Sequence, residues 1–221
     1  MLLPTVFCVA FFHYTANLLR DNAYDAGQTA IKQVRDIADG YLSQICAVSD
    51  TVYVSPDIQR IRYVKPLFTA EKYFELHQRA KYLDNFSAQW ELLTNLYLYQ
   101  SELDCLLDSG HIYTPINQKD KVIHDWIGLT DEEFAACMNE RQVHRFRFVS
   151  QGSRILYMRT LAERLDQGKT PVMTLIIVIN TERLNKILCS TGENNGGSAY
   201  ILLPDGQVFG APQDNDQEPG Y

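Results

Sequence analysis

The sequence predicts an α+β fold in which a long N-terminal helix packs on an antiparallel sheet of five strands. Two observations lead to this fold class: a helical period that persists from Leu19 to Val52, and five later stretches with strand-like patterns. The last of these contains an unbroken apolar run from Val172 to Ile179. Such a run belongs in the middle of a sheet whose two faces are both covered.

The long helix is predicted by the spacing of its apolar residues. Between Leu19 and Val52 they recur at steps of three and four, with a mean of about 3.7 residues, which is the period of an α-helix and not of a strand. About 30 helical residues would span some 45 Å, long enough to transmit a displacement along the axis. The alternative is the longest helix of an ordinary core, and periodicity does not separate the two.

The N-terminal residues are membrane-like but short. No charged residue lies between Met1 and Leu19, yet the apolar run turns polar at His13, before the roughly 20 residues that a spanning helix needs. The basic residues and the cleavage site of a signal peptide are missing. We interpret residues 1–17 as the remnant of a transmembrane helix, and a buried N-terminal helix or strand is the alternative.

The rest of the helices and strands follow from shorter patterns. A second helix is expected from Thr69 to about Gln89, with a buried stripe formed by Phe74, His77, Leu83 and Phe86. Thr130 and Glu133 form a capping box that begins another helix. A short helix is expected over Thr181–Leu188. The five expected strands are Leu93–Gln100, Leu106–Tyr113, Val143–Val149, Arg154–Leu161 and Val172–Asn180.

The C-terminal residues predict a hairpin outside this sheet. A strand-like run from Ala199 to Leu203 is followed by Pro204-Asp205-Gly206 and by the apolar pair Val208 and Phe209. We expect a helical spine and an α+β domain over residues 18–190 and a linker over residues 191–197. Because an isolated hairpin is only marginally stable, we interpret residues 198–221 as the start of a truncated second module. The polar residues at its end are expected to be disordered.

Composition and motifs exclude several functions. The chain has 20 Lys and Arg against 27 Asp and Glu, so its net charge of −7 has the wrong sign for nucleic-acid contact by this segment. Its five Cys show no zinc-type spacing and no disulfide framework, and a single Cys105–Cys137 bridge is the alternative if the segment faces an oxidising space. His111 and Asp108 come with no nucleophile, phosphate-loop or metal motif. We therefore expect no enzyme, no catalytic residues, no metal and no cofactor.

A ligand site is predicted from polar and aromatic residues that alternate along three strands. We expect them to share one sheet face, where aromatic rings give a pocket its shape and guanidinium groups bind carboxylates or hydroxyls. Trp126 is expected to form a wall of this pocket. The alternative is a solvated face on which Arg stems cover Tyr rings. The strand residues, besides Asn95, are Tyr97, Tyr99, Arg145, Arg147, Tyr157 and Arg159.

Several of these segments together resemble the extracytoplasmic Cache-type sensor regions of Gram-positive membrane receptors. They are the apolar N-terminal end, the long helix, the strands around Leu96–Tyr99 and Asp108–Tyr113, the strand Val172–Asn180, and Ala199–Phe209, which is similar to the opening hairpin of a second, membrane-proximal module. The resemblance implies a PAS-like sheet, a small-molecule ligand such as a sugar or organic acid, and a membrane anchor through the N-terminal helix. It also implies a homodimer through the long helix, with this segment on the outer side of the cell membrane.

The same resemblance implies a cytoplasmic effector, for which we favour an AraC-type DNA-binding region. A sensor histidine kinase or chemoreceptor is the alternative, and a free-standing exported binding or scaffold protein is a second class of function. Amino-acid-binding members carry a constellation of Tyr, Arg, Trp-Tyr and Asp. That constellation does not fit this sequence, because Trp126 is not followed by Tyr and no Arg stands just before it.

Overall fold

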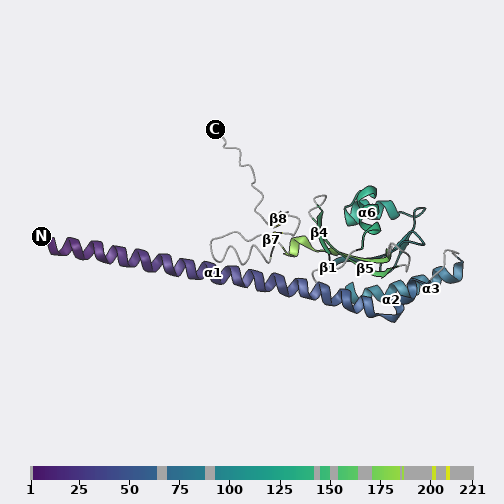
Figure 1. Cartoon of the computed structure of the whole chain (residues 1–221), viewed down its shortest axis with the longest axis horizontal. Coiled ribbons are helices and arrows are strands. Elements are labelled where there is room, and N and C mark those ends of the chain that lie inside the picture. The colour runs from purple at the N-terminus through teal and green to yellow at the C-terminus, as the bar shows by residue number, and fades with distance from the viewer. Residues whose placement is uncertain are drawn as a thin grey trace, which may run out of the picture. The chain divides into compact units, whose positions relative to one another are not determined.

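The computed structural model describes residues 2–63, 69–87, 93–141, 145–149, 154–163, 171–184, 186, 201–202 and 208–209. The chain divides into two compact units, one of residues 41–184 with 203–207 and one of residues 1–40, 185–202 and 208–221. Each is described by itself. The fold class predicted from the sequence is confirmed, since a long N-terminal helix precedes an antiparallel sheet (Figure 1).

The first helix, α1 (Leu2–Val54), is continuous over 53 residues. It includes the predicted helix and extends it at both ends, because no proline interrupts the chain between Pro4 and Pro56. Its last turns, from Tyr41 onward, belong to the unit that contains the sheet. No helix in the described part of the chain combines the length, apolarity and low charge that a bilayer span requires.

The sheet has six antiparallel strands in the order β3-β2-β1-β6-β5-β4. The predicted strand Leu106–Tyr113 is two short strands, because Asp108 turns the chain by accepting a hydrogen bond from the Gly110 N–H at 2.9 Å. The apolar strand β6 lies between β1 and β5 with every residue buried, as predicted. The strands are β1 (Leu93–Gln100), β2 (Cys105–Leu107), β3 (Ile112–Tyr113), β4 (Arg145–Val149), β5 (Arg154–Glu163) and β6 (Pro171–Ile179).

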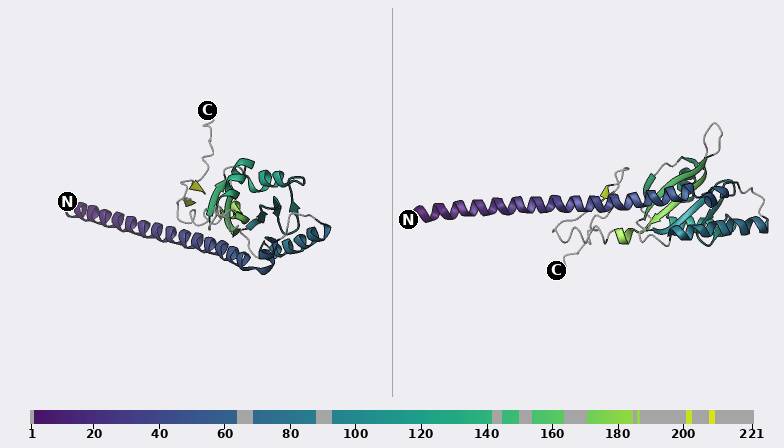
Figure 2. Two further views of the ribbon diagram at one scale, coloured as in Figure 1. Left: turned by 45° about the vertical axis from the view of Figure 1, so that its right-hand side comes forward. Right: turned by 90° about the horizontal axis from the view of Figure 1, so that it is seen from below.

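Helices cover both faces of this sheet (Figure 1), and the turned view on the left of Figure 2 keeps the same order of layers. We name them the α6 face and the α1 face after a helix that covers each. Because side chains alternate along a strand, Tyr97 and Leu156 belong to the α6 face, and their neighbours Leu98 and Tyr157 belong to the α1 face.

The α1 face is covered by the end of α1 and by the helices that follow it, which bury Val48, Val52 and Ile58. Thr69 caps α3 as predicted, accepting a hydrogen bond from the Lys72 N–H at 3.4 Å. The expected helix 69–89 is broken into three pieces. The predicted burial of Leu83 is confirmed, but that of Phe74 is wrong, since Phe74 is 63% exposed and the buried stripe of α3 runs through Leu76 and Ala80. These elements are α2 (Pro56–Ile61), α3 (Ala70–Ala80), η1 (Lys81–Leu83) and α4 (Asp84–Ser87).

The α6 face is covered by the segment inserted between β3 and β4. It contains α5 (Lys119–Val122), the π-helical turn η2 (Ile123–Ile127) and α6 (Asp131–Asn139). The predicted capping box of α6 is present, with Thr130 and Glu133 bonding each other's backbone N–H. Apolar residues of this insert pack with the sheet into one core: Tyr97, Leu106, Val122, Ile123, Ile127, Leu129, Phe134, Cys137, Met138, Leu156, Met158, Ile176 and Val178.

Beyond β6, residues 181–184 are helical, which agrees with the start of the predicted helix. The predicted C-terminal hairpin is also present, as β7 (Ile201–Leu202) pairs antiparallel with β8 (Val208–Phe209). The predicted linker 191–197 and the polar tail after the hairpin lie outside the described residues.

Candidate ligand-binding site

The predicted site residues do not all share one face of the sheet. Arg147 pairs with Leu156 across β4 and β5, so Arg147 belongs to the α6 face with Tyr97 and Tyr99. The register places Tyr157 and Arg159 on the opposite face, where they contact α1. The expectation of one shared face is therefore wrong for these two residues, because alternation within a strand does not reveal its register against the next strand.

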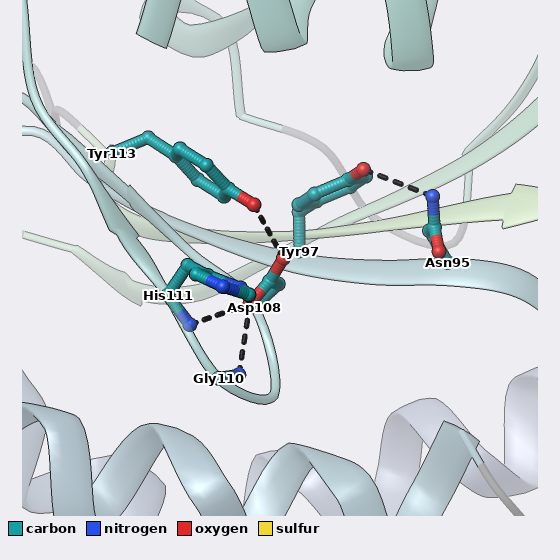
Figure 3. A network of polar contacts seen from close by, with 6 residues as sticks. All are labelled: Asn95, Tyr97, Asp108, Gly110, His111 and Tyr113. Carbon is teal, nitrogen blue, oxygen red and sulfur yellow. Dashed lines mark hydrogen bonds and ion pairs between the residues drawn. The ribbon is translucent and has the colours of Figure 1, made fainter. Parts of the chain in front are cut away.

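A network of polar contacts centred on Asp108 lies at the β2–β3 turn (Figure 3). One carboxylate oxygen accepts hydrogen bonds from the backbone N–H groups of Gly110 (2.9 Å) and His111 (2.7 Å), and His111 Nδ1 lies 3.3 Å away. The other oxygen accepts from the Tyr113 hydroxyl at 2.9 Å. His111 is exposed and stacks on the Tyr113 ring at 5.8 Å between centroids.

Tyr97 is the buried member of this cluster, 3% exposed. Its hydroxyl accepts a hydrogen bond from the Asn95 amide at 3.0 Å, and among the described residues its own proton has no acceptor. Burial, and then the nearby Asp108 carboxylate, raise the pKa of Tyr97 to about 12. The hydroxyl is thus a protonated donor at neutral pH and is suited to a carbonyl, carboxylate or hydroxyl oxygen of a ligand.

Tyr99, two residues along β1, is held by a different carboxylate. Its hydroxyl donates to Asp104 at 2.9 Å, and Lys119 donates to both oxygens of Asp104 at 2.7 and 2.8 Å. Asp104 itself has a positive φ of 46°, a conformation that aspartate tolerates better than most residues. The Tyr99 ring meets Phe134 edge to face at 5.1 Å. The hydroxyl and the ring of Tyr99 are therefore both in contact with other parts of the protein, and the ring contact joins β1 to the insert.

Arg147 is also engaged within the protein. Its guanidinium donates to Cys137 Sγ at 2.7 Å and to Glu133 at 3.3 Å, which joins β4 to α6. The backbone N–H of Thr130 lowers the pKa of Glu133, and the Thr130 hydroxyl and Arg147 act in the same direction. The side chain is 29% exposed, so part of it is open to solvent.

Two predicted residues stand apart from these contacts. Trp126, on η2, is 53% exposed and is absent from the apolar core that its neighbours form. Arg145 pairs through its backbone with Met158. Whether these residues, or any of the seven predicted residues, bind a ligand stays a prediction.

Several residues of the α6 face were missed by the sequence interpretation. Asp104, Lys119 and Tyr113 make the contacts that hold Tyr99 and Asp108. The sequence contained one usable signal: Asp108-Ser109-Gly110 is a turn-forming series in which aspartate bonds the backbone two residues on. No such signal pairs Lys119 with Asp104, which are 15 residues apart.

On the α1 face, Tyr157 and Arg159 contact the last turns of α1. Arg159 donates to Ser49 Oγ at 3.1 Å, pairs with Asp50, and lies 4.6 Å from the centre of the Tyr53 ring. Its side chain is only 13% exposed. These contacts join the sheet to the helix through Arg159.

The described residues hold no group of three or more His, Cys, Asp or Glu side chains placed to hold a metal ion. The thiols of Cys46, Cys105 and Cys137 are not in disulfides, and burial raises the pKa of Cys105 to about 12, which keeps that thiol protonated and unreactive.

No protein-family model matches this chain, and no curated protein matches it in sequence. Among solved structures it is similar to the ligand-binding domain of the Campylobacter jejuni chemoreceptor Tlp3 in complex with 4-methylisoleucine, with 16% identity, a TM-score of 0.43, and coverage of 86% of this chain and 68% of that one. The sensory domain of C. jejuni Tlp3 has 15% identity and a TM-score of 0.43, and the match covers 89% of this chain and 72% of that one. The ligand-binding domain of Tlp3 in complex with L-norvaline has 16% identity and a TM-score of 0.42, and the match covers 89% of this chain and 69% of that one. TM-scores in this range do not establish a common fold, so the function is argued from the chain's own contacts.

Proposed function

We propose that this chain is the signal-sensing domain of a membrane-anchored receptor and that it binds a small polar molecule, such as a sugar or organic acid, outside the cell. The observation that carries the proposal is that the two faces of the sheet make different contacts. The α6 face carries the buried Tyr97 hydroxyl and the partly exposed Arg147, and the α1 face is joined to a continuous helix through Arg159. A ligand that prefers one packing of the sheet would therefore displace the helix.

The membrane anchor and the assembly belong to the same proposal. The first part of α1 would provide the anchor, and two copies would associate along this helix. The support is the exposure of large apolar side chains along α1, which a monomer seldom displays in such number. They include Phe11, Phe12, Tyr14, Leu18, Leu19, Tyr24 and Ile31.

For the cytoplasmic effector, the proposal relies on the sequence resemblance alone, which favours an AraC-type DNA-binding region over a histidine kinase or a chemoreceptor signalling region. The gene that encodes the chain decides between them. A reading frame with a membrane segment and an effector supports the receptor, and a frame that encodes neither would make the chain a free-standing exported binding protein.

A thermal-shift screen tests the binding function directly. The whole chain would be heated in the presence of single sugars, organic acids and amino acids, and we expect at least one compound to raise Tm. Tyr97→Phe removes only the hydroxyl and should reduce that shift. Tyr73→Phe is a matched control on the exposed surface of α3 and should leave the shift unchanged. If no compound of these classes raises Tm, or if both variants lose the shift equally, the proposed site is wrong.

A further inference from the structure

The contact between β5 and α1 is polar on one side of the helix. Cys46, Ser49, Asp50 and Tyr53 follow one another at steps of three, one and three, so they lie on one face of α1 over two turns. All four lie against Tyr157 and Arg159, which alternate on one face of β5. The neighbouring stripe of α1, formed by Ile45, Val48 and Val52, is apolar and buried.

Arg159 makes the strongest of these contacts. Its guanidinium bonds the fully buried Ser49 hydroxyl, pairs with Asp50, and lies over the Tyr53 ring, while only 13% of its side chain is exposed. Charge-assisted hydrogen bonds and cation–π contacts are both stronger when water is partly excluded. Three partners in adjacent turns therefore hold Arg159 against a short length of helix.

This arrangement permits one axial register of the helix. Asp50 is the carboxylate that Arg159 uses, and the nearest other carboxylate on α1 is Asp39, eleven positions earlier and about 16 Å along the axis. A slide by one turn, about 5.4 Å, would leave Arg159 without an anionic partner on α1. The helix can be docked in this register or released from it, but it has no second paired position.

We propose that Arg159 is a latch that fixes the last turns of α1 on β5, and that its release from Asp50 and Ser49 is the step by which the sheet moves the helix. The regulatory part of this inference rests on the proposed sensing function, and the latch itself does not. Arg159 is accordingly a positioning residue that acts through α1.

The native thiol of Cys46 provides a local readout, because it lies one turn from Ser49 on the latched face. It is partly exposed, and burial followed by the nearby Asp50 raises its pKa, so it should react slowly with a thiol reagent while α1 is docked. Labelling of the whole chain, resolved by peptide mass spectrometry, would compare Cys46 with the fully buried Cys105, which reports global opening.

We expect Arg159→Gln to accelerate Cys46 labelling by about tenfold or more, since a hydrogen bond to a charged group is lost, and to leave Cys105 unchanged. Arg159→Lys, which keeps the charge, should give an intermediate rate. Asp50→Asn, on a largely exposed side chain, should also accelerate Cys46 labelling, partly because the carboxylate that raises the Cys46 pKa is removed. Arg159→Gln removes a charge that lowers this pKa, so its acceleration of Cys46 labelling reports release of the helix alone. Arg141→Gln removes another ion pair to β5, the 2.6 Å contact with Glu163, and should change neither thiol.

Unchanged Cys46 labelling in Asp50→Asn and Arg159→Gln would overturn the latch, and so would equal acceleration of Cys46 and Cys105, which reports loss of global stability. Because thiol labelling needs no ligand and no membrane, a negative labelling result can be distinguished from a negative thermal-shift screen.

Discussion

At the scale of single residues, carboxylates organise the α6 face. Asp108, Asp104 and Glu133 each hold an aromatic or basic side chain of the site in place. The sequence predicted Tyr97, Tyr99 and Arg147 as site residues but predicted none of the carboxylates that hold them. Those partners come from turns and from the insert, and no local pattern predicts which distant lysine or tyrosine a turn aspartate will meet.

Tyr97 leads to a pH prediction. Its pKa is raised to about 12 from an ordinary value of 10, so the unfolded chain releases this proton first as pH rises. The raised pKa of Tyr97 adds at most about 3 kcal/mol to the free energy of unfolding. This contribution is complete below pH 10 and is lost between about pH 10 and 12. Urea unfolding at pH 8, 10 and 11 should show a smaller alkaline loss in Tyr97→Phe than in the native chain.

Tyr73→Phe, at an exposed position, serves as the control and should retain the native alkaline loss. Identical pH profiles for the native chain and Tyr97→Phe would show that the Tyr97 hydroxyl does not keep its proton more strongly in the folded state.

At the scale of elements, α1 is a long helix that contains two glycines, which are unfavourable to helix formation. Gly27 and Gly40 lie inside the helix, and an added Cβ at either position would meet no atom within 4 Å. Glycine inside a helix costs roughly 0.5–1 kcal/mol relative to alanine, because it loses more conformational freedom on folding. Neither glycine is needed for close packing.

We therefore expect Gly40→Ala to stabilise the surrounding turns and to slow amide hydrogen exchange over residues 36–44 by about two- to fivefold. Gly110→Ala, which also has open space but lies in the β2–β3 turn, should leave exchange in α1 unchanged. Faster exchange in Gly40→Ala would show that the helix needs the freedom of glycine at this point.

The short elements show where tertiary contacts override a sequence pattern. The periodicity from Thr69 onward predicts one helix, yet the chain forms α3, η1 and α4 in succession. Phe74 is exposed because the face of α3 that meets the core is chosen by Leu76 and Ala80, and a helical period alone does not say which of two apolar stripes is covered.

At the scale of the whole molecule, the exposed apolar residues of α1 allow a test of the proposed homodimer. Ile31 is 72% exposed, and a glutamate there would place a charge in any interface along this face. We expect sedimentation velocity to show a dimer for the native chain and a dissociation constant raised at least about tenfold for Ile31→Glu.

Ile116→Glu is the matched control, because Ile116 is 99% exposed and lies outside α1. It should leave the dissociation constant unchanged. A native chain that sediments as a monomer, or two variants that weaken the dimer equally, would contradict association through α1.

The amino-acid sequence by itself determined the long helix, the central apolar strand, the capping box of α6 and the C-terminal hairpin, because each follows from a local period or a local hydrogen-bond motif. Only the tertiary structure decided which residues share a sheet face. Tyr157 and Arg159 alternate along β5 as Tyr97 and Tyr99 do along β1, but strand register directs them to α1 and not to the α6 face. Register depends on contacts between segments far apart in the chain, and a one-residue difference exchanges the two faces.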